Sequence, residues 1–562
     1  MSDKIQKLQK LVHHIQPTMT TKIIELCTHL NLCIYCTQRY LGKRDFKKDY
    51  RDHILELPLV WNQIQHVMTK KQKLISKKYI RNDNGIEVNE NEVKENENKV
   101  KEIKDEKDVD ELQVVNELKN DTIVCPTCLG LLQLSHHQLT TEIIQKLESE
   151  RYQLKSNKFN LSIQLPTQLT IRNQSMILWI KKSVAVEDLV QIPHAVEVKE
   201  IVKLLVKRKI EEMMKLVFEP KSDFTMNITF NHPETTSDYE FLTLIPNTKL
   251  KVTKKRKSGV VTLQGLSQEK VSKAVQSATF EDFERGQFCP PPMVKMGPIV
   301  EDISLQHSQI YIAGRYCKLK RHISNAAWVI GGKRLCEDSV EELIENFVTK
   351  KFRNTGFKFS SAGREDADVL MLGRGRPFYM ELINPHHLNV SELEMWELQE
   401  TINNQVDGKI KVNDLQIVSR ESTSVLKDSA STKCKSYSCM IKLNKPVPLE
   451  LLKKASEMKN LTVDQRNPTR VPRRADLVRV KTIEYMELIP QGIDDNQCTT
   501  QVLVNLKTSA GTYVKEFMHG DEGRTKPSLV DLLECETIEV IYLDVLEIFL
   551  DWPQQTSKPV VG

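Results

Sequence analysis

Between residues 157 and 280 the order of apolar and polar side chains alternates between two patterns. The runs FNLSIQL (159–165) and MNITF (226–230) change polarity at every residue, as a strand with one buried face does. Between them, VEVKEIVKLLVKRKIEEMMKL (196–216) places apolar side chains three and four positions apart, which predicts a helix with one apolar face. This part of the chain is therefore predicted to form an α+β module.

A second region begins after the Pro-rich segment FCPPPMVKMGP (288–298), which predicts a domain boundary. Beyond it, QIYIAGRYCKL (309–319) predicts a strand, and Ser339-Val340-Glu341-Glu342 predicts a capping box that opens a helix. The apolar face of that helix is predicted to hold Val340, Leu343, Ile344, Phe347 and Val348. Next, a loop rich in Gly, Arg and Asp stands directly before the strand-like run FYMELI (378–383), a position where catalytic side chains are often displayed.

Length and composition limit the class of protein. A chain of 562 residues is too long for one core of roughly 150 residues, so two to four domains are expected. With 40% hydrophobic and 28% charged residues, and no apolar run near the ~20 residues of a membrane span, a membrane protein is not expected. Residues 82–111 hold Asn, Glu, Lys and Asp without an aromatic residue, which predicts a disordered insertion.

Two Cys-x-x-Cys pairs flank this insertion, Cys33 with Cys36 and Cys125 with Cys128. The N-terminal segment has no apolar signal region, so the twelve cysteines are expected to be reduced thiols that can bind a metal. Four thiolates can close a tetrahedral zinc site, while unconnected core cysteines and a redox dithiol are the alternatives. Because protein would fill all four positions, we expect a structural zinc and not a catalytic one.

The formal net charge is only +6, but basic residues are concentrated in two segments. The first contains Lys249, Lys251, Lys254, Lys255, Arg256 and Lys257, and the second contains Arg466, Arg470, Arg473, Arg474, Arg479 and Lys481. One such run is often only a solvated surface, but two of them favour a polyanionic partner. The run 254–257 also has the composition of a nuclear localisation signal.

The segment Gly363–Val369 carries three carboxylates and one Arg within a few residues. A salt-bridged turn is the plain interpretation of such a segment. In an extended backbone Glu365 would point away from Asp366, while Asp366 and Asp368 would share a face. This geometry does not choose which carboxylate reacts.

The stretch GREDADVLMLGRGRPFYMELINPHH (363–387) resembles the active-site motif of the archaeal and eukaryotic tRNA pseudouridine synthases of the Pus-ten family. In that family, GREDVDVR is followed by LG-x-GRPF and by an E-[LI]-x-NP strand. Other motifs occur around it in the family's order: YIAGRY, SVEELI, KSYS (435–438), VDQRNPTRV with RR, AGTYVKEFMHGDEGRTKPS, LDV and DWP. The two Cys pairs and FNHPET (230–235) also fit, so the resemblance covers nearly everything except the polar insertion.

The resemblance implies a role for several residues. The family's nucleophilic Asp falls on Asp366, and its active-site Tyr falls on Tyr437. The GTY-x-[KR] element, which TruB-type synthases share, places a substrate-contacting Tyr at Tyr513 and a basic partner of the carboxylate at Lys515. Leu533 matches the apolar residue of the family's third motif, which implies that it contacts the substrate.

The isomerisation of uridine requires residue types of this kind. Breaking the N-glycosidic bond and rejoining the uracil through C5 requires a nucleophile or an electrostatic partner near C1′, which Asp366 can supply. The Lys515 ammonium would favour the ionised carboxylate, and Tyr437 can stack on the detached base and help to remove the C5 proton. The chain departs from the family at Ala367, where Val is usual, and at Leu370, where an Arg that can contact RNA or a carboxylate is usual.

The target uridine must leave its stack before it can reach such a pocket, and basic residues offset that cost. Phosphate contacts are expected from Arg376, Arg470, Arg473 and Arg474, and from Lys254, Lys255, Arg256 and Lys257. The α+β module with its basic loop resembles the THUMP-type RNA-binding domain that this family places N-terminally. It is expected to hold RNA by shape.

The sequence therefore predicts an α+β protein of two parts. Residues 1–280 are an accessory domain with the zinc site and the THUMP-like module, and residues 285–562 are a mixed-sheet pseudouridine synthase catalytic domain. The resemblance implies a tRNA partner, modification at T-arm position 54, 55 or both, and a reaction that needs no organic cofactor. The lack of a long apolar run predicts no membrane partner, and the run 254–257 suggests a location in the nucleus as well as the cytoplasm. Whether other structured RNAs are partners stays open.

Two other functions are weighed against this one. A non-catalytic RNA-binding or RNA-processing adaptor would need none of Asp366, Tyr437 and Lys515. A zinc-dependent RNA deaminase would need a His-x-Glu with Pro-Cys-x-x-Cys arrangement, and Cys125 is not preceded by Pro.

Overall fold

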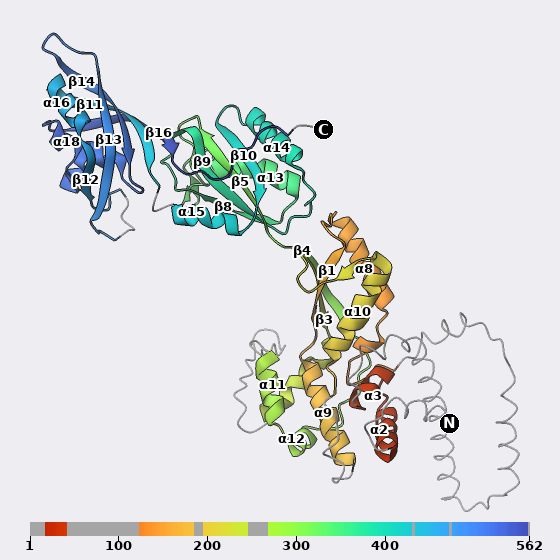
Figure 1. Cartoon of the computed structure of the whole chain (residues 1–562). Coiled ribbons are helices and arrows are strands. Elements are labelled where there is room, and N and C mark those ends of the chain that lie inside the picture. Colours follow the sequence, from red (N-terminus) through yellow and green to blue (C-terminus); the bar gives the residue numbers. More distant parts are fainter. Residues whose placement is uncertain are drawn as a thin grey trace, which may run out of the picture. The chain divides into compact units, whose positions relative to one another are not determined.

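A computed structural model describes residues 17–41, 123–184, 195–244, 268–429, 433–470 and 475–559. The chain divides into two compact units (Figure 1), one of residues 1–146 with 158–305 and the other of residues 147–157 with 306–562. The division into functional domains at 280 and 285 stays a prediction. Among the described residues, none of the helices has the length and hydropathy that crossing a membrane requires.

The first unit contains a four-stranded sheet in the order β2-β1-β3-β4. These strands are β1 (Lys158–Gln164), β2 (Val217–Phe218), β3 (Phe224–Asn231) and β4 (Ile299–His307). Every second residue of β3 is buried, as the alternating sequence predicts. Helix α10 (Val198–Met214) contacts β1 and buries its apolar face. The predicted strands and helix of this module are therefore confirmed.

The remaining helices of the first unit contact one another and the loops around the sheet. Helix α9 is in contact with α11, α12 and η3, and a separate apolar core lies among them. The bounds of these helices are α2 (Pro17–His29), α3 (Ile34–Tyr40), η1 (Leu131–Gln133), α8 (His136–Ser149), α9 (Gln168–Ser183), η3 (Pro233–Leu244), α11 (Gln268–Ser277) and α12 (Phe280–Arg285).

The second unit contains a ten-stranded sheet in the order β10-β5-β9-β16-β11-β14-β13-β12-β15, with β8 also paired to β9. Strand β16 is parallel to β9 but antiparallel to β11, so the sheet is mixed, and the predicted α+β class is confirmed. The strands are β5 (Ile310–Lys318), β8 (Gly356–Ser361), β9 (Leu370–Ile383), β10 (Ile410–Val418), β11 (Lys435–Pro448), β12 (Lys459–Gln465), β13 (Arg479–Gln491), β14 (Cys498–Thr508), β15 (Thr525–Lys526) and β16 (Ile538–Ile548).

Helices pack against this sheet and complete its core. Helix α14 contacts β10 and α13, and α16 contacts β11 and β13 (Figure 1). Helix α17 contacts β16. A hairpin of β6 (Val329–Ile330) and β7 (Lys333–Arg334) forms a sheet of its own. The helices are α13 (Val340–Phe352), α14 (Glu392–Gln405), η4 (Glu421–Thr423), α15 (Ser424–Ser429), α16 (Leu449–Glu457), α17 (Val514–His519), η5 (Gly520–Gly523) and α18 (Leu529–Leu532).

The start of α13 illustrates how the sequence sets these helices. The hydroxyl of Ser339 accepts a hydrogen bond from the Glu342 N–H at 3.2 Å, so Ser339 caps the helix as predicted. Val340, Ile344 and Val348 are fully buried, while Leu343 and Phe347 pack against the same core from a half-buried position. The predicted apolar face is confirmed.

Candidate active site and metal centre

The loop between β8 and β9 holds Asp366 beside two cations from other parts of the chain. Asp366 Oδ2 lies 3.2 Å from Arg470 Nη1 and 3.5 Å from Lys515 Nζ. Its side chain is 43% exposed, so it is open to a ligand while it is paired. Lys515 stands in the first turn of α17, and Arg470 follows β12. The structure thus brings together three residues that the sequence singles out.

Asp368 competes for the same cation. Lys515 Nζ is 2.8 Å from Asp368 Oδ2, which is shorter than its distance to Asp366. Partial burial raises the pKa of Asp368, but the hydrogen bond and the charge of Lys515 outweigh this and hold the pKa below its usual value. Both carboxylates therefore reach Lys515, and the geometry leaves the choice of nucleophile open.

Glu365 faces the opposite way from Asp366, as predicted. Its side chain is 1% exposed and lies 2.7 Å from Arg376 Nε. The hydroxyl of Tyr316 donates to the same carboxylate at 3.1 Å. Glu365 therefore anchors the loop from beneath, while Asp366 stays at the surface.

Two predicted contacts have to be corrected. Arg376 is 1% exposed, pairs with Glu365 and donates to the Ala362 carbonyl at 2.8 Å, so its guanidinium supports the loop and is not available to a phosphate. Leu533 follows α18 and is fully buried in the main core, so it packs beneath the site and does not line it.

The two predicted tyrosines are held differently. Tyr437 on β11 is 9% exposed, and burial raises its pKa to about 12, so its hydroxyl is neutral near pH 7. Tyr513 is half-buried just before α17, where the side chain of Gln465 bonds both its N–H and its carbonyl at 2.9 Å. Gln465 thereby fixes the chain two residues before Lys515.

Lys435 is a residue that the sequence analysis missed. Gly363 has a φ of +83°, and a Cβ placed there would lie 3.2 Å from Lys435 Nζ and 3.3 Å from Arg376 Nη1. Two basic side chains therefore flank the start of the Asp366 loop, and glycine leaves them room. Burial and the nearby Arg376 lower the pKa of Lys435 to about 7, although Glu365 opposes this shift.

The other predicted basic residues lie outside the described residues. Arg473 and Arg474 fall in 471–474, and Lys254, Lys255, Arg256 and Lys257 fall in 245–267. Their contacts with RNA stay predictions, as do the substrate contacts of Tyr437 and Tyr513. The predicted insertion 82–111 also lies outside the described residues.

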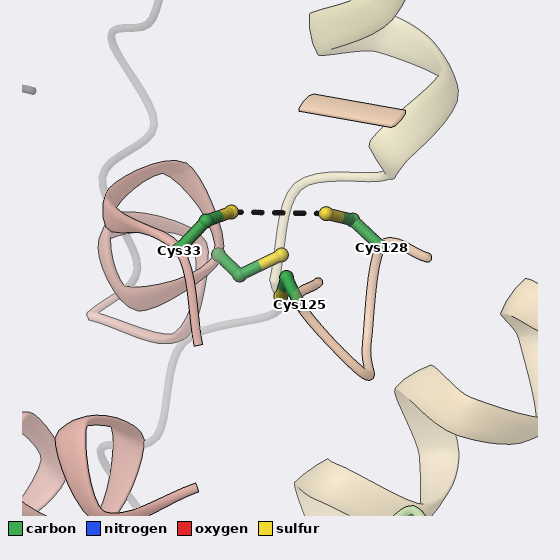
Figure 2. Close-up of side chains that lie close together, drawn as sticks. Cys33, Cys125 and Cys128 are labelled. Carbon is green, nitrogen blue, oxygen red and sulfur yellow. Dashed lines mark hydrogen bonds between the residues drawn. The ribbon is translucent and has the colours of Figure 1, made fainter. Parts of the chain in front are cut away.

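The four predicted cysteines come together in the first unit. Their sulfur atoms all lie within 4.8 Å of one another, and all four residues are buried. Cys33 Sγ and Cys128 Sγ are 3.7 Å apart and point toward one another, with Cys125 beside them (Figure 2). Tetrahedral ligands at about 2.3 Å from zinc stand about 3.8 Å apart, so this spacing fits the ion.

The surroundings of the cluster also suit a thiolate site. Arg39 is 1% exposed, and its Nη1 donates to Cys36 Sγ at 3.5 Å. Burial raises the pKa of Cys33 and of Cys128, whereas hydrogen bonds from Cys128, Cys33 and Cys36 hold the pKa of Cys125 well below its usual value. The nearby Arg39 cation would partly compensate the negative charge of four zinc-bound thiolates.

Comparison with known proteins identifies the family to which the chain belongs. Residues 125–305 match the family described as eukaryotic Pus10, N-terminal, and residues 311–549 match Pus10, C-terminal. The tRNA pseudouridine synthase Pus10 of Homo sapiens is 35% identical over 445 residues, which cover 77% of this chain and 80% of the human protein. The chain belongs to the Pus10 family.

Relatives from other organisms agree. The tRNA pseudouridine synthase Pus10 of Xenopus laevis is 36% identical over 457 residues, covering 80% of this chain and 83% of that protein. The Methanopyrus kandleri Pus10 is 38% identical over 256 residues, covering 43% of this chain and 56% of that protein. The resemblance inferred from the sequence motifs is therefore confirmed.

Among solved structures, two assemblies are similar at a low level. A Cbf5-Nop10-Gar1 complex shares 14% identity and a TM-score of 0.23, covering 42% of this chain and 48% of that chain. An H/ACA RNP bound to a substrate RNA containing 2′-deoxyuridine shares 12% identity and a TM-score of 0.21, covering 41% and 46%. TM-scores this low do not support a conclusion about the fold or the function of this chain.

Proposed function

We propose that this member of the Pus10 family isomerises uridine to pseudouridine in tRNA, with Asp366 as the reactive carboxylate. The observation that carries the proposal is the position of Asp366. It is a half-exposed carboxylate 3.2 Å from Arg470 and 3.5 Å from Lys515, on the loop whose sequence matches the family's active-site motif.

The chemistry needs an anion near C1′ of the target uridine. As the N1–C1′ bond breaks, positive charge develops on the sugar, and the Asp366 carboxylate stabilises it or bonds to it. The uracil then turns so that C5 forms the new bond to C1′, C5 loses its proton and N1 gains one. No electron acceptor enters this balance. Arg470 and Lys515 place two positive charges beside the Asp366 carboxylate, at 3.2 Å and 3.5 Å.

Tyr437 is proposed to orient the detached base and to take part in the proton transfer from C5. Because its pKa is about 12, the tyrosine acts as a neutral hydroxyl near pH 7, and a water molecule or a carboxylate has to accept the proton. Lys435, with a pKa of about 7, lies on the same face of β11 two residues away and supplies a basic group nearby.

The hairpin of β6 and β7 offers a surface for RNA next to this loop. Trp328 is 45% exposed and Ile330 is 61% exposed, and the basic residues Lys333 and Arg334 follow them, of which Arg334 is already paired with Glu342 at 2.5 Å. The segment that leads into the hairpin is bound to the loop, because the His322 N–H donates to the Ala367 carbonyl at 2.8 Å. An aromatic side chain beside basic ones is suited to stack on an unpaired base and to hold its phosphates.

The cysteine cluster is proposed to bind one zinc ion that stabilises the first unit. Cys33, Cys36, Cys125 and Cys128 would hold it, and with four protein ligands it would have no open position for substrate. We also propose that the α+β module of this unit binds tRNA in the manner of a THUMP domain, and that the protein acts in nucleus and cytoplasm.

The proposed function is tested by incubating the purified full chain with an unmodified tRNA transcript and mapping pseudouridine chemically at each position. The expected result is pseudouridine at T-arm position 54, 55 or both, and none with an Asp366→Asn variant. Tight tRNA binding without any pseudouridine would instead identify a non-catalytic adaptor. Formation of inosine or uridine from an exocyclic amine would identify a deaminase.

A further inference from the structure

Lys318 is a buried cation in the second unit that the proposed mechanism does not use. It is the last residue of β5 and is fully buried. Its Nζ donates to the carbonyls of Ile323 and Asp366 at 2.9 Å and to that of Ala367 at 3.1 Å. An ammonium has three donors, and here all three are used by main-chain oxygens.

Two of these carbonyls belong to the catalytic loop itself. The Asp366 carbonyl also accepts the Val369 N–H at 3.1 Å, so its peptide group has donors from two directions. The Asp366 side chain leaves the same residue toward Arg470 and Lys515 at the surface. When the Asp366 peptide group is held, the direction of the Asp366 carboxylate is held with it, because only a few rotatable bonds separate the carbonyl from the carboxylate.

A role in substrate contact or in simple space filling does not fit these observations. A fully buried ammonium cannot touch a nucleotide in this conformation. An apolar side chain would fill the same volume without removing a charge from water. A buried lysine has to offset that free-energy cost through its hydrogen bonds. The hydrogen bonds that Lys318 donates go to the loop that carries Asp366 and to the segment that leads into the β6–β7 hairpin.

We propose that Lys318 is a positioning residue for catalysis, which holds the main chain of the Asp366 loop so that the Asp366 carboxylate is directed at the substrate. The proposal rests on the proposed function, since it concerns the same carboxylate. Without the ammonium, the Asp366 and Ala367 carbonyls lose a buried donor and the loop relaxes. A displacement of about 1 Å at a reacting group costs about 100-fold in rate.

The experiment compares Lys318→Met with Lys320→Met in the full chain. Lys320 is the matched control, because it is exposed on the same segment and donates to a main-chain oxygen outside the loop, that of Asp407 at 2.9 Å. We expect Lys318→Met to lower the single-turnover rate on bound tRNA about 100-fold with unchanged tRNA affinity. We expect Lys320→Met to leave both unchanged.

Hydrogen exchange in the free protein separates this inference from the function itself. Lys318→Met should speed exchange at the Val369 amide, while Lys320→Met should not. Lys318→Gln, which keeps two N–H donors, should give intermediate exchange and an intermediate rate. Unchanged Val369 exchange, an unchanged rate, or equal losses of rate and affinity would overturn the proposal.

Unfolding of both Lys318 variants would also overturn it, by assigning Lys318 to the fold. A wild-type protein that makes no pseudouridine would refute the proposed function, and the exchange result would still decide whether Lys318 orders the loop.

Discussion

The two exposed carboxylates of the Asp366 loop differ in the cations that surround them. Asp366 lies between Arg470 and Lys515, whereas Asp368 is bound to Lys515 at 2.8 Å and is 54% exposed. Asp366 is thus paired with two cations, and 43% of its side chain stays exposed. Asp368 shares one of these cations, so its charge also sets the position of Lys515.

Asp366→Asn should lower pseudouridine formation by at least about 1000-fold, because it keeps the shape of the side chain but removes the charge and the nucleophile. Binding of tRNA, measured by filter retention at fixed salt, should remain. Asp368→Asn is the matched control, and we expect only a partial loss of rate from it. An inactive Asp368→Asn variant beside an active Asp366→Asn variant would show that Asp368 is the nucleophile.

Lys435 makes the stability of the second unit depend on pH. Its pKa is lowered to about 7 in the folded protein, whereas an unfolded lysine titrates near 10.5. Below pH 7 Lys435 is charged in both the folded and the unfolded protein, so the full free-energy cost of burying its charge lowers the stability of the folded state. As pH rises from 7 toward 10.5, the folded form is neutral while the unfolded form still binds a proton, so the cost is progressively removed.

Lys435→Met should therefore be more stable than the wild type at pH 7, and this advantage should shrink as pH approaches 10. The change should be at most about 1.4 kcal/mol per pH unit, measured by urea unfolding across that range. Lys442→Met, an exposed lysine on the same strand, is the control and should show no such trend. A constant stability difference between wild type and Lys435→Met would mean that Lys435 is charged throughout.

At the scale of helices and strands, local sequence patterns were sufficient to predict the elements that neighbouring residues alone determine. The spacing of apolar residues in 196–216 predicted α10, and the cap at Ser339 predicted the start of α13. The two Cys-x-x-Cys pairs predicted the cluster across an insertion of the chain, because ligand chemistry does not depend on separation in sequence.

The environment of β9 was not available from such patterns. This strand is paired to β5, β8 and β16, and it is buried from Gly375 to Met380 without alternation. The alternation of buried and exposed residues expected for a strand therefore could not predict that Arg376 faces the buried Glu365 and not solvent. Lys318 was missed for a related reason, although a lysine at the end of the mostly apolar β5 was a signal.

The elements around the cysteine cluster should depend on zinc for their stability. Helix α3 begins at Ile34 with Cys33 as its N-cap, and the Cys125–Cys128 turn precedes η1, so two short elements would share the proposed ion. Zinc should co-purify at one atom per chain, and the variant with Cys33→Ala and Cys125→Ala should lose it. Elemental analysis measures this, and thermal unfolding should show a destabilised first unit.

The control replaces Cys289 and Cys498 by Ala, because neither belongs to the cluster. This control should keep its zinc. If the Cys33 and Cys125 variant retained a full equivalent, the four cysteines would not be the ligands. Any loss of activity on zinc removal should appear as weaker tRNA binding, because the ion has no open position for chemistry.

At the scale of the whole molecule, binding and chemistry are expected to separate between the two units. The residues around Asp366 all belong to the second unit, and the cysteine cluster belongs to the first. A substrate as large as tRNA can contact both, and its phosphates would be held by charges far along the chain from the reacting uridine.

Neutralising the run Lys254, Lys255, Arg256 and Lys257 to Gln should weaken tRNA binding and leave the single-turnover rate on saturating tRNA unchanged. Each phosphate contact that is lost reduces the slope of log affinity against log salt by about 0.7 to 0.9, because fewer counterions are released. A matched control neutralises four exposed lysines of the second unit, namely Lys442, Lys445, Lys453 and Lys454. Both variants change the formal net charge from +6 to +2, so only a local contact can make their slopes differ. Equal slopes in the two variants would assign the run to solubility or nuclear import, whereas a reduced slope confined to the 254–257 variant would place tRNA phosphates on that run.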